Sequence, residues 1–442
     1  MNTVLALADR NVPRYTSYPT APNFTGAVGA ETYAEWLSAL PEAATLSLYI
    51  HVPYCTHLCF FCGCHTKAVR RSGPIEHYTE RLIDEIALVG AAVGRRKVVH
   101  LHWGGGTPSI LGERRLAAIT GKIGASFDLS ALREHAIELD PRRLSKQLVR
   151  ALAGIGVTRA SVGVQDCSFH VQKASGRIQP FVLVEEAVDW LRAAGIDNIN
   201  VDLMYGLPRQ TADNVAHSAR RTASLSPQQL ALFGYAHVPW LRPRQRLIDD
   251  ASLPGPLQRL EQVRTAAAVL RSVGYVPIGL DHFALPGDSL AEAARTGRLR
   301  RNFQGYTTDE ADALIGLGAS AISKLPQGFV QNAPDIAGYS RAIEAGRLAS
   351  MKGVALSADD RLRAHIIERL MCDLAVDLDE AAADRDFSAE IAALKALAEE
   401  GLVKLDGRTV AATERGRPFL RLIAAAFDVY LPARQTRHSI AV

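Results

Sequence analysis

Short β-rich segments alternate with amphipathic helical segments along most of this chain. The candidate strands are residues 46–52, 98–103, 135–140, 159–164, 198–206, 230–238 and 276–283. Candidate helices lie between them, at about 76–93, 113–125, 142–154, 181–194, 211–224 and 256–273. In the last of these helices, apolar residues recur at helical spacing, namely Leu257, Leu260, Val263, Ala267 and Leu270. Such alternation predicts parallel strands that are joined by crossover helices.

Polar and reactive residues gather where the predicted strands end. The sequences at these ends are, in chain order, YIHVPYC, HWGGGTP, ELDP, GVQD, DLMYGLP and YAHVP. Active sites of (β/α) barrels are built from the C-terminal ends of several strands, whereas an open sheet offers one crevice. Because six successive strands contribute such ends, we expect an α/β fold with a partial (β/α) barrel of the TIM type.

The pattern changes near residue 351, where helical segments take over. Residues 356–371 and 388–403 read as helices, and a hairpin with its turn at Asp406–Gly407 precedes a final helix near 414–430. We expect an N-terminal covering segment, a catalytic barrel and a mostly helical, winged-helix-like C-terminal domain, at 1–35, 36–350 and 351–442. The second of these helices is acidic, which favours a packing role over DNA binding.

The composition narrows the class of protein. The 442 residues carry 50 Lys+Arg and 46 Asp+Glu, and 48% are hydrophobic, which excludes a disordered or low-complexity chain. No run approaches the roughly 18 apolar residues of a membrane helix, and the start has no secretory signal pattern. The basic residues form no continuous stripe, and RPRQR at 242–246 is interpreted as solvated surface. We expect a cytoplasmic protein that binds neither nucleic acid nor a membrane.

The six cysteines point to chemistry rather than to disulfides. A chain of this length buries enough surface to fold without disulfides, and a reducing compartment keeps thiols free. Four of the six lie within ten residues and two stand apart, in the order Cys55, Cys59, Cys62, Cys64, Cys167 and Cys372. Bridges within the group of four would close small, strained loops. The two separate cysteines are interpreted as small buried hydrophobic residues.

The first three cysteines form C-x3-C-x2-C, a spacing that suits either zinc or an iron–sulfur cluster. Structural zinc needs four ligands, and because no second pair follows downstream, His51, His57 or His65 would have to complete the site. Iron–sulfur clusters are bound by cysteines at such compact spacing. A cluster with three cysteine ligands leaves one iron open to a substrate or cofactor. A glycine run, GGGTP at 104–108, follows the second strand and allows a ligand to approach the backbone closely.

Together these two motifs resemble the radical S-adenosylmethionine (SAM) superfamily, in which the open iron binds the amino and carboxylate groups of SAM. Further segments resemble the oxygen-independent coproporphyrinogen III oxidases in particular, over nearly the whole chain. They are PRYTSYPT, YIHVPYCTHLCFFCGC, LHWGGGTPS, GVQD with Arg177, NVDLMYGLP, GYAHVP, GLDHFALP, RNFQGYTT and GLGASAIS. PRYTSYP and RNFQGYTT are the most telling, because a generic barrel has no need of them.

The resemblance implies a set of cofactor-binding residues. Cys55, Cys59 and Cys62 would bind a [4Fe–4S] cluster, whereas Cys64 would not be a ligand and would pack beneath the cluster or support the chemistry. The SAM on the cluster would be held by Tyr49, Gly105, Glu138 and Ile322. A second SAM would be held by Phe61, Gly106, Thr107, Gln165, Arg177, Asp202 and Ala236. The planar fork of Arg177 suits a carboxylate, although taken alone Arg177 would be interpreted as a surface charge.

The resemblance also implies the reaction. A 5′-deoxyadenosyl radical made from SAM would take hydrogen from the propionates on rings A and B of coproporphyrinogen III, and loss of CO2 would give protoporphyrinogen IX. Because this substrate carries four negative charges, we expect cationic side chains in its binding site. The candidate substrate-binding residues in the two most telling motifs are Arg14, Tyr15, Arg300, Arg301 and Asn302. The partners would be coproporphyrinogen III and a low-potential electron donor such as a flavodoxin or ferredoxin, and the enzyme would be a monomer. The alternatives are a haem chaperone or an anaerobic haem-degrading methyltransferase of the same superfamily.

Overall fold

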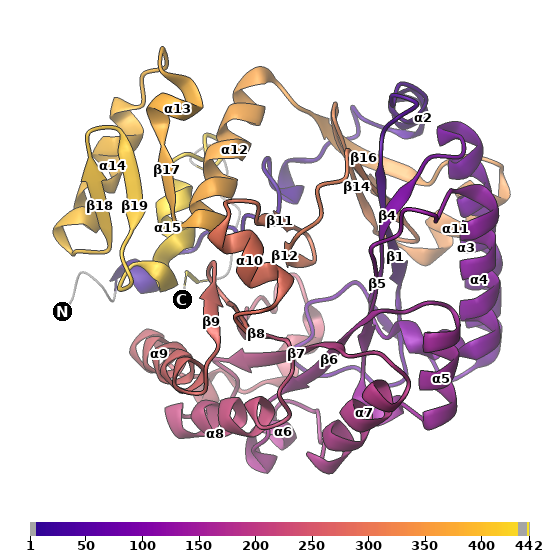
Figure 1. Ribbon diagram of the computed structural model, residues 1–442, viewed down its shortest axis with the longest axis horizontal. Coiled ribbons are helices and arrows are strands. Elements are labelled where there is room, and N and C mark those ends of the chain that lie inside the picture. Colours follow the sequence, from indigo (N-terminus) through magenta and orange to yellow (C-terminus); the bar gives the residue numbers. More distant parts are fainter. Residues whose placement is uncertain (1–5, 432–439, 442) are drawn as a thin grey trace.

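A curved sheet forms the centre of the computed structural model, which describes residues 6–431 and 440–441 (Figure 1). Its strands follow the order β16–β15–β14–β13–β1–β4–β5–β6–β7–β8–β10–β9. The strands from β13 to β8 run parallel to one another. Their bounds are β13 Ala313–Leu317, β1 Leu46–Val52, β4 Val98–Gly105, β5 Glu134–Leu139, β6 Arg159–Gln165, β7 Asn198–Tyr205 and β8 Gln229–Gly234. The edge strands β16 and β9 do not pair with each other, so the predicted partial barrel is confirmed.

Helices cover the outer side of the parallel strands (Figure 1). The long ones are α3 Ser72–Val93, α4 Gly112–Ser126, α5 Lys146–Gly154, α7 Val182–Ala193, α8 Ala212–Ala223 and α9 Pro256–Ser272. All of them match predicted helices, with bounds that differ by a few residues. Helix α5 begins later than predicted because the hydroxyl of Ser145 caps it by accepting the backbone N–H of Leu148, while 141–143 form the 3-10 helix η3 (Pro141–Arg143).

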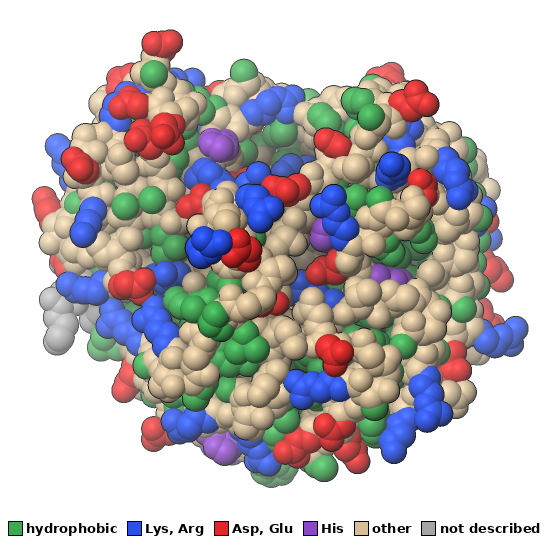
Figure 2. Space-filling model, viewed as in Figure 1, with side chains coloured by type: hydrophobic (Ala, Val, Ile, Leu, Met, Phe, Trp, Pro, Cys, Tyr) green, Lys and Arg blue, Asp and Glu red, His purple; other side chains and the backbone are tan. Residues whose placement is uncertain are grey.

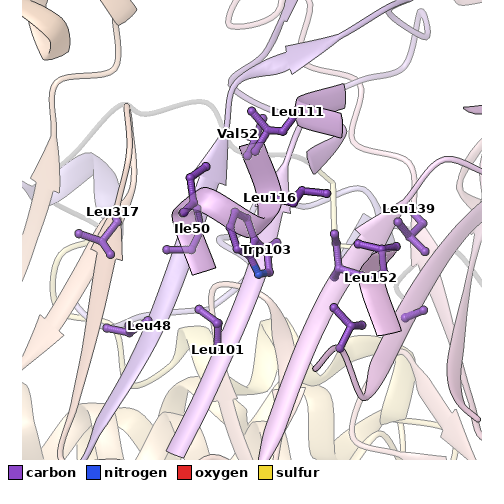
Figure 3. Packing of buried hydrophobic residues seen from close by; sticks show 14 of the residues in the cluster. Leu48, Ile50, Val52, Leu101, Trp103, Leu111, Leu116, Leu139, Leu152 and Leu317 are labelled. Carbon is purple, nitrogen blue, oxygen red and sulfur yellow. The ribbon is translucent and has the colours of Figure 1, made fainter. Parts of the chain in front are cut away.

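Side chains of the central strands alternate between the helical layer and the barrel interior. Leu48, Ile50 and Val52 of β1 pack together with Leu101 and Trp103 of β4 in the apolar layer beneath the helices (Figure 3). The residues between them in the sequence are polar, and they face the other way, into the barrel. The interior of this barrel is therefore lined by polar groups rather than filled by aliphatic side chains, which leaves room for ligands.

The predicted strand at 276–283 is wrong, because two short antiparallel strands replace it. They are β9 (Val276–Ile278) and β10 (His282–Ala284), and β10 pairs antiparallel with β8 as well. The chain reverses at Gly279, whose φ of +51° favours glycine. A Cβ at that position would overlap the ring of Tyr306, so the tight turn and the close approach both require glycine.

The opposite edge of the sheet carries antiparallel strands. They are β14 (Ile322–Leu325), β15 (Gly328–Asn332) and β16 (Ser350–Ala355), with helix α11 (Ile336–Glu344) between the last two. The change to helical structure therefore comes after Ala355 rather than at residue 351. The next helix begins there because Ser357 and Asp360 form a reciprocal capping box.

The C-terminal domain contains helices around a small sheet (Figure 1). Its elements are α12 Ala358–Asp373, β17 Ala375–Asp377, α13 Leu378–Ala382, α14 Ser388–Glu399, β18 Val403–Asp406, β19 Thr409–Ala412, η6 Arg417–Phe419 and α15 Leu420–Ala425. The hairpin turn predicted at Asp406–Gly407 lies between β18 and β19. The final helix is shorter than predicted, because α15 ends at Ala425.

The N-terminal segment packs against two different apolar cores. Leu7 and Val12 are buried in the core of the C-terminal domain, together with Tyr15 and Tyr18. Farther along, the 3-10 helix η1 (Ala21–Asn23) leads to helix α2 (Ala30–Ser38), and Tyr33 and Leu37 of α2 are buried in the barrel core. This segment therefore joins the C-terminal domain to the barrel. Among the described residues, no helix is both long and apolar enough to cross a membrane.

Candidate active site

The four clustered cysteines lie on one loop at the C-terminal end of β1. The loop connects two short paired strands, β2 (Tyr54–Cys55) and β3 (Lys67–Ala68). It is anchored where the backbone N–H of Phe60 donates to the carbonyl of Ser175 at 2.9 Å. Along it, Cys59 is buried, Cys55 and Cys62 are half-buried, and Cys64 is exposed.

Hydrogen-bond donors surround the thiols of the predicted cluster ligands. The Thr107 hydroxyl donates to Cys55 Sγ at 3.3 Å, and Arg177 Nη1 donates to Cys59 Sγ at 3.5 Å. A hydrogen bond from the Cys64 thiol lowers the pKa of Cys62 to about 6. Burial raises the pKa of the Cys55 thiol, while the hydrogen bonds from Thr107 and Thr66 act in the opposite direction. The thiolate is the form that binds iron or zinc. The loop therefore fits a group that is bound by three thiolates.

No three His, Cys, Asp or Glu side chains come close enough together to hold a single metal ion, within the ranges 6–431 and 440–441. An iron–sulfur cluster has several iron atoms, so its three cysteines bind different irons and need not converge on one point.

The glycine run packs against the start of the cysteine loop. A Cβ on Gly105, where φ is +107°, would lie 2.6 Å from His51 Cε1, and one on Gly106 would lie 2.5 Å from the carbonyl oxygen of Tyr54. The N–H of Gly105 donates to Glu138 Oε2 at 3.1 Å. Glycine is therefore required here by close approach of the backbone to its neighbours.

The residues predicted for the first SAM come from adjacent strands. Tyr49 of β1 lies opposite Gly316 of β13, and its hydroxyl is 3.1 Å from His51 Nδ1. Glu138, at the end of β5, contacts His102 Nε2 at 3.5 Å and the glycine run as described. Ile322 begins β14, where its backbone lies against Gly316. Tyr49, Glu138, Gly105 and Ile322 therefore lie around one end of the barrel.

The residues predicted for the second SAM come from the cysteine loop, the glycine run, and the strands and connecting segments that follow β5. Arg177 is buried, not a surface charge, and its Nη2 donates to the carbonyl of Gly163 at 2.5 Å and lies 3.5 Å from Asp140 Oδ1. Asp202 accepts hydrogen bonds from Ser161 and Asn200, and burial followed by the charge of Glu138 raises its pKa.

Gln245 is a contact residue that the sequence interpretation missed. It lies in the RPRQR segment that was interpreted as solvated surface, but it is only 1% exposed. Its Nε2 donates to the carbonyl of Phe61 at 2.9 Å and to that of Ala236 at 3.1 Å. Gln245 thus connects two residues of the predicted second SAM site. A single polar residue between arginines carries no local signal for burial.

A polar cavity of about 150 Å³, here called the inner cavity, lies inside the barrel. Charged and polar side chains of successive strands line it, among them Ser47, His100, His102, Glu134, Glu138, Arg159, Asn200, Asp202 and His282. Glu138 and Asp202 therefore connect the predicted SAM residues to this cavity. Some of its charges compensate each other, since Arg159 Nη1 lies 3.3 Å from Glu134 Oε2.

A larger cavity of about 460 Å³, here called the outer cavity, adjoins the inner one. Asn302, Thr307, Asp309 and Leu314 line both. On the face of the molecule drawn in Figure 2, a hollow in the middle is surrounded by Lys or Arg, Asp or Glu, and His side chains. The chain between α9 and β13 contributes helix α10 (Ser289–Arg295) and the hairpin of β11 (Arg300–Asn302) and β12 (Gly305–Thr307).

The outer cavity brings together four of the five predicted substrate residues. Tyr15, Arg300, Arg301 and Asn302 line it. The sequence interpretation missed three further basic side chains in its lining, Lys324, Arg361 and His365. The sequence offered no reason to assign these three to the substrate site, because they come from β14 and α12, outside the two most telling motifs.

Arg14 lies apart from the outer cavity. Its Nη2 donates to the carbonyl of Gly234 at 2.7 Å, and it lines a small cavity of about 40 Å³ with Arg259, Arg301 and Arg421. Of these, Arg301 also reaches the outer cavity.

The chain is similar to known proteins over nearly all of its length. Residues 49–222 match the radical SAM superfamily, and residues 356–419 match the HemN C-terminal domain. The chain is 47% identical to the oxygen-independent coproporphyrinogen III oxidase of Bradyrhizobium diazoefficiens, with 99% of each chain covered. It is 43% identical to that of Paracoccus denitrificans, with 99% of this chain and 98% of that protein covered.

A solved structure has the same fold. It is the coproporphyrinogen III oxidase of Escherichia coli, described as a radical SAM enzyme, with a TM-score of 0.90 and 36% identity. The match covers 95% of this chain and 100% of that one. A radical SAM domain implies a [4Fe–4S] cluster and SAM as cofactors, and the thiols of the cysteine loop fit such a cluster. Fold, domain matches and full-length relatives agree that this chain belongs to the family of oxygen-independent coproporphyrinogen III oxidases.

Proposed function

We propose that this protein converts coproporphyrinogen III to protoporphyrinogen IX without oxygen, as a step of haem biosynthesis. The observation that carries the proposal is the position of the outer cavity. It is lined by several cations and adjoins the inner cavity, which Glu138 of the predicted SAM site also lines. The outer cavity can therefore hold a tetra-anionic substrate next to the inner cavity, where SAM would supply the radical.

The cofactors supply the difficult step. When bound, the cluster and SAM provide a 5′-deoxyadenosyl radical that takes a hydrogen atom from the β-carbon of a propionate. The protein positions the substrate, excludes water and holds the cofactors. We assign the cluster to Cys55, Cys59 and Cys62, and this assignment is supported by the donors around their thiols. Cys64, which is exposed and donates to Cys62, supports the loop and is not a ligand.

We further propose two SAM sites. The first comprises Tyr49, Gly105, Glu138 and Ile322. The second comprises Phe61, Gly106, Thr107, Gln165, Arg177, Asp202 and Ala236. The second is supported by the buried guanidinium of Arg177 beside Cys59, which offers a planar fork to a carboxylate, and by Gln245, which holds Phe61 and Ala236 together.

The substrate belongs in the outer cavity in our proposal. Each propionate becomes a vinyl group when one hydrogen atom passes to the 5′-deoxyadenosyl radical, CO2 leaves and one electron passes to an external electron acceptor. The reacting side chains must therefore reach the inner cavity. The remaining carboxylates need partners, and Arg300, Arg301, Lys324 and Arg361 supply positive charge. Residues 15–18 line the same cavity, which supports the covering role proposed for the N-terminal segment.

The remaining proposals concern partners and surroundings. We propose a low-potential electron donor, a monomeric enzyme and a cytoplasmic location. All six cysteines are free thiols, which suits a reducing compartment.

Anaerobic turnover tests the function. Protein with a reconstituted cluster is mixed with coproporphyrinogen III, SAM and dithionite, and we expect two CO2 per substrate together with protoporphyrin fluorescence after oxidation. The Cys59→Ala variant is the control, since it lacks a proposed cluster ligand. Haem binding with no porphyrinogen turnover would instead favour the haem chaperone, and methyl transfer to haem would favour the haem-degrading enzyme.

A further inference from the structure

The segment that follows Ala236 holds the cysteine loop from its outer side. It contains the 3-10 helices η4 (Pro243–Leu247) and η5 (Asp250–Ser252). Arg244 Nε donates to the carbonyl of Leu58 at 3.0 Å, and the Arg244 guanidinium lies 5.7 Å from the centre of the Phe60 ring. With the bond from Gln245 to Phe61, the segment contacts the loop that carries the proposed cluster ligands at Leu58, Phe60 and Phe61. The segment therefore packs directly on the loop of the cluster site.

The outward side of this segment is both apolar and basic. Trp240, Leu241 and Leu247 are 43%, 62% and 59% exposed. Arg244 and Arg246 are exposed beside them. Exposed apolar side chains of this size grouped with cations are typical of interaction sites rather than of plain surface. We call residues 240–247 the docking face.

The positive charge of the docking face is local and available to a partner. The whole chain has a net charge of only +4. No ion pair joins Arg242, Arg244 or Arg246 to a carboxylate anywhere in the part of the chain that the structure describes. The nearest acidic residues in sequence are Asp249 and Asp250, and Asp250 is engaged by His237 at 2.8 Å.

The docking face opens toward the cysteine loop. A cavity of about 220 Å³ separates the two, and its lining includes Cys62, Cys64 and Lys67 on one side and Leu241, Arg242 and Arg244 on the other. A cluster held by Cys62 therefore has one of its sulfur ligands at the bottom of a surface recess that is surrounded by cations. Electrons reach a buried centre most readily where it comes closest to the surface.

We propose that this face is the docking site for the flavodoxin that reduces the cluster. This inference rests on the proposed function. Flavodoxins are small acidic proteins that expose an apolar edge of their flavin, so acidic residues would meet Arg244 and Arg246 while the flavin edge meets Leu241 and Leu247. The fully reduced, anionic flavin gives up one electron and becomes neutral. The [4Fe–4S] cluster accepts that electron and changes its charge from 2+ to 1+, and no bond forms and no proton moves.

Binding and electron transfer test the proposal without porphyrinogen turnover. The double variant Arg246→Glu/Leu247→Ser changes two exposed residues that make no contact with the cysteine loop. Arg150→Glu is the matched control, because Arg150 is exposed on α5. The holoenzyme is titrated with an acidic bacterial flavodoxin at low salt to obtain Kd, and stopped-flow absorbance follows reduction of the cluster by the reduced flavodoxin and, separately, by dithionite.

We expect the double variant to raise Kd at least about tenfold and to slow reduction by flavodoxin in proportion. Reduction by dithionite, cluster content and SAM affinity should stay at wild-type values, and Arg150→Glu should match wild type. Added salt should weaken binding of the wild type. Equal Kd values for the double variant and wild type would overturn the proposal, as would a ferredoxin that binds this face when flavodoxin does not. Failure of porphyrinogen turnover alone would count against the proposed function and leave these readouts intact.

Discussion

A hydrogen bond of 2.6 Å joins the backbone N–H of Gly318 to the side chain of Glu85, although the two residues lie 233 positions apart. The same oxygen accepts the hydroxyl of Tyr339 at 2.8 Å, and the other oxygen accepts Asn332 Nδ2 at 2.6 Å. Glu85 is 2% exposed. This carboxylate therefore fastens α3 to the turn between β13 and β14, the turn that leads to Ile322 of the proposed SAM site.

Replacing Glu85 should destabilise the protein. In Glu85→Gln an amide NH2 takes the place of one acceptor oxygen and faces groups that themselves donate. Leaving a buried donor unsatisfied costs about 1–3 kcal/mol, and we expect a loss of that size in the free energy of unfolding by urea. Glu80→Gln, an exposed position on the same helix, is the control and should change little. Equal stability of the two variants would show that the three hydrogen bonds contribute nothing net.

The same carboxylate should make stability depend on pH. Burial raises the pKa of Glu85 to about 7, from an ordinary value near 4.5. Between these values the folded protein keeps a proton that the unfolded chain has lost, so the free energy of unfolding falls as pH rises and levels off above about 7. The full shift corresponds to about 3 kcal/mol. Denaturation curves between pH 5 and 8 should show this fall for wild type and not for Glu85→Gln. Parallel pH profiles would contradict the assignment.

Single cysteine substitutions should distinguish the three proposed cluster ligands from Cys64, which is not proposed as a ligand. Cys55→Ala, Cys59→Ala and Cys62→Ala should each lose most of the iron, the sulfide and the visible absorbance of the reconstituted cluster. Cys64→Ala should keep them, since the proposed role of Cys64 is a hydrogen bond to Cys62. Cys167→Ala, which packs against the barrel core, is the control. A cluster lost in Cys64→Ala and retained in one of the other three would reverse the ligand assignment.

Arg177 should control how many SAM molecules bind. Its guanidinium contacts Cys59 Sγ and the carbonyl of Gly163, and it is the buried cation of the proposed second site. Arg177→Met should reduce SAM binding from two molecules per cluster to one, with cluster content unchanged, in equilibrium dialysis with labelled SAM. Arg143→Met, an exposed arginine nearby, should still bind two. A wild-type enzyme that binds a single SAM, or a variant that still binds two, would contradict the second site.

Local patterns predicted the elements well and the long-range contacts poorly. The alternating run at 46–52 matches β1 residue for residue, because its apolar side chains face the helical layer while the polar ones between them face the barrel interior. The run at 276–283 failed, since its apolar character continues through the turn at Gly279. Only the ring of Tyr306, which lies 27 residues downstream, shows why the chain reverses there.

In the candidate site, too, residues in short motifs were predictable and residues that act through distant contacts were not. The cysteine spacing and the glycine run are short motifs, so their chemistry was predictable from sequence. Glu85 and Gln245 were not, because each acts through partners that are far away in the chain. Arg14 and Arg301 come from the two most telling motifs, yet only Arg301 reaches the outer cavity. Motif membership says which residues belong to a site, and packing decides which way each side chain faces.

Arg301 should set the affinity for the porphyrinogen. Its guanidinium lies 4.5 Å from the centre of the Tyr306 ring and 3.8 Å from Asp281, and its Nε and Nη1 have no hydrogen-bond partner within the described ranges. These two nitrogens are buried, but the residue lines the outer cavity, where its guanidinium offers a positive charge and a hydrogen bond to a propionate. A lost hydrogen bond to a charged group costs about 1.5–3 kcal/mol, so Arg301→Gln should raise KM for coproporphyrinogen III by about ten- to a hundredfold.

Cofactor readouts distinguish this effect from general damage to the fold. Reductive cleavage of SAM by dithionite in the absence of porphyrinogen should be the same in Arg301→Gln as in wild type, because Arg301 touches none of the proposed SAM residues. Arg298→Gln removes an exposed arginine from the same stretch of chain and should leave KM unchanged. If Arg301→Gln kept the wild-type KM, the substrate carboxylates would have to be bound elsewhere, and the other cations of the outer cavity, Arg300, Lys324 and Arg361, would be the next to substitute.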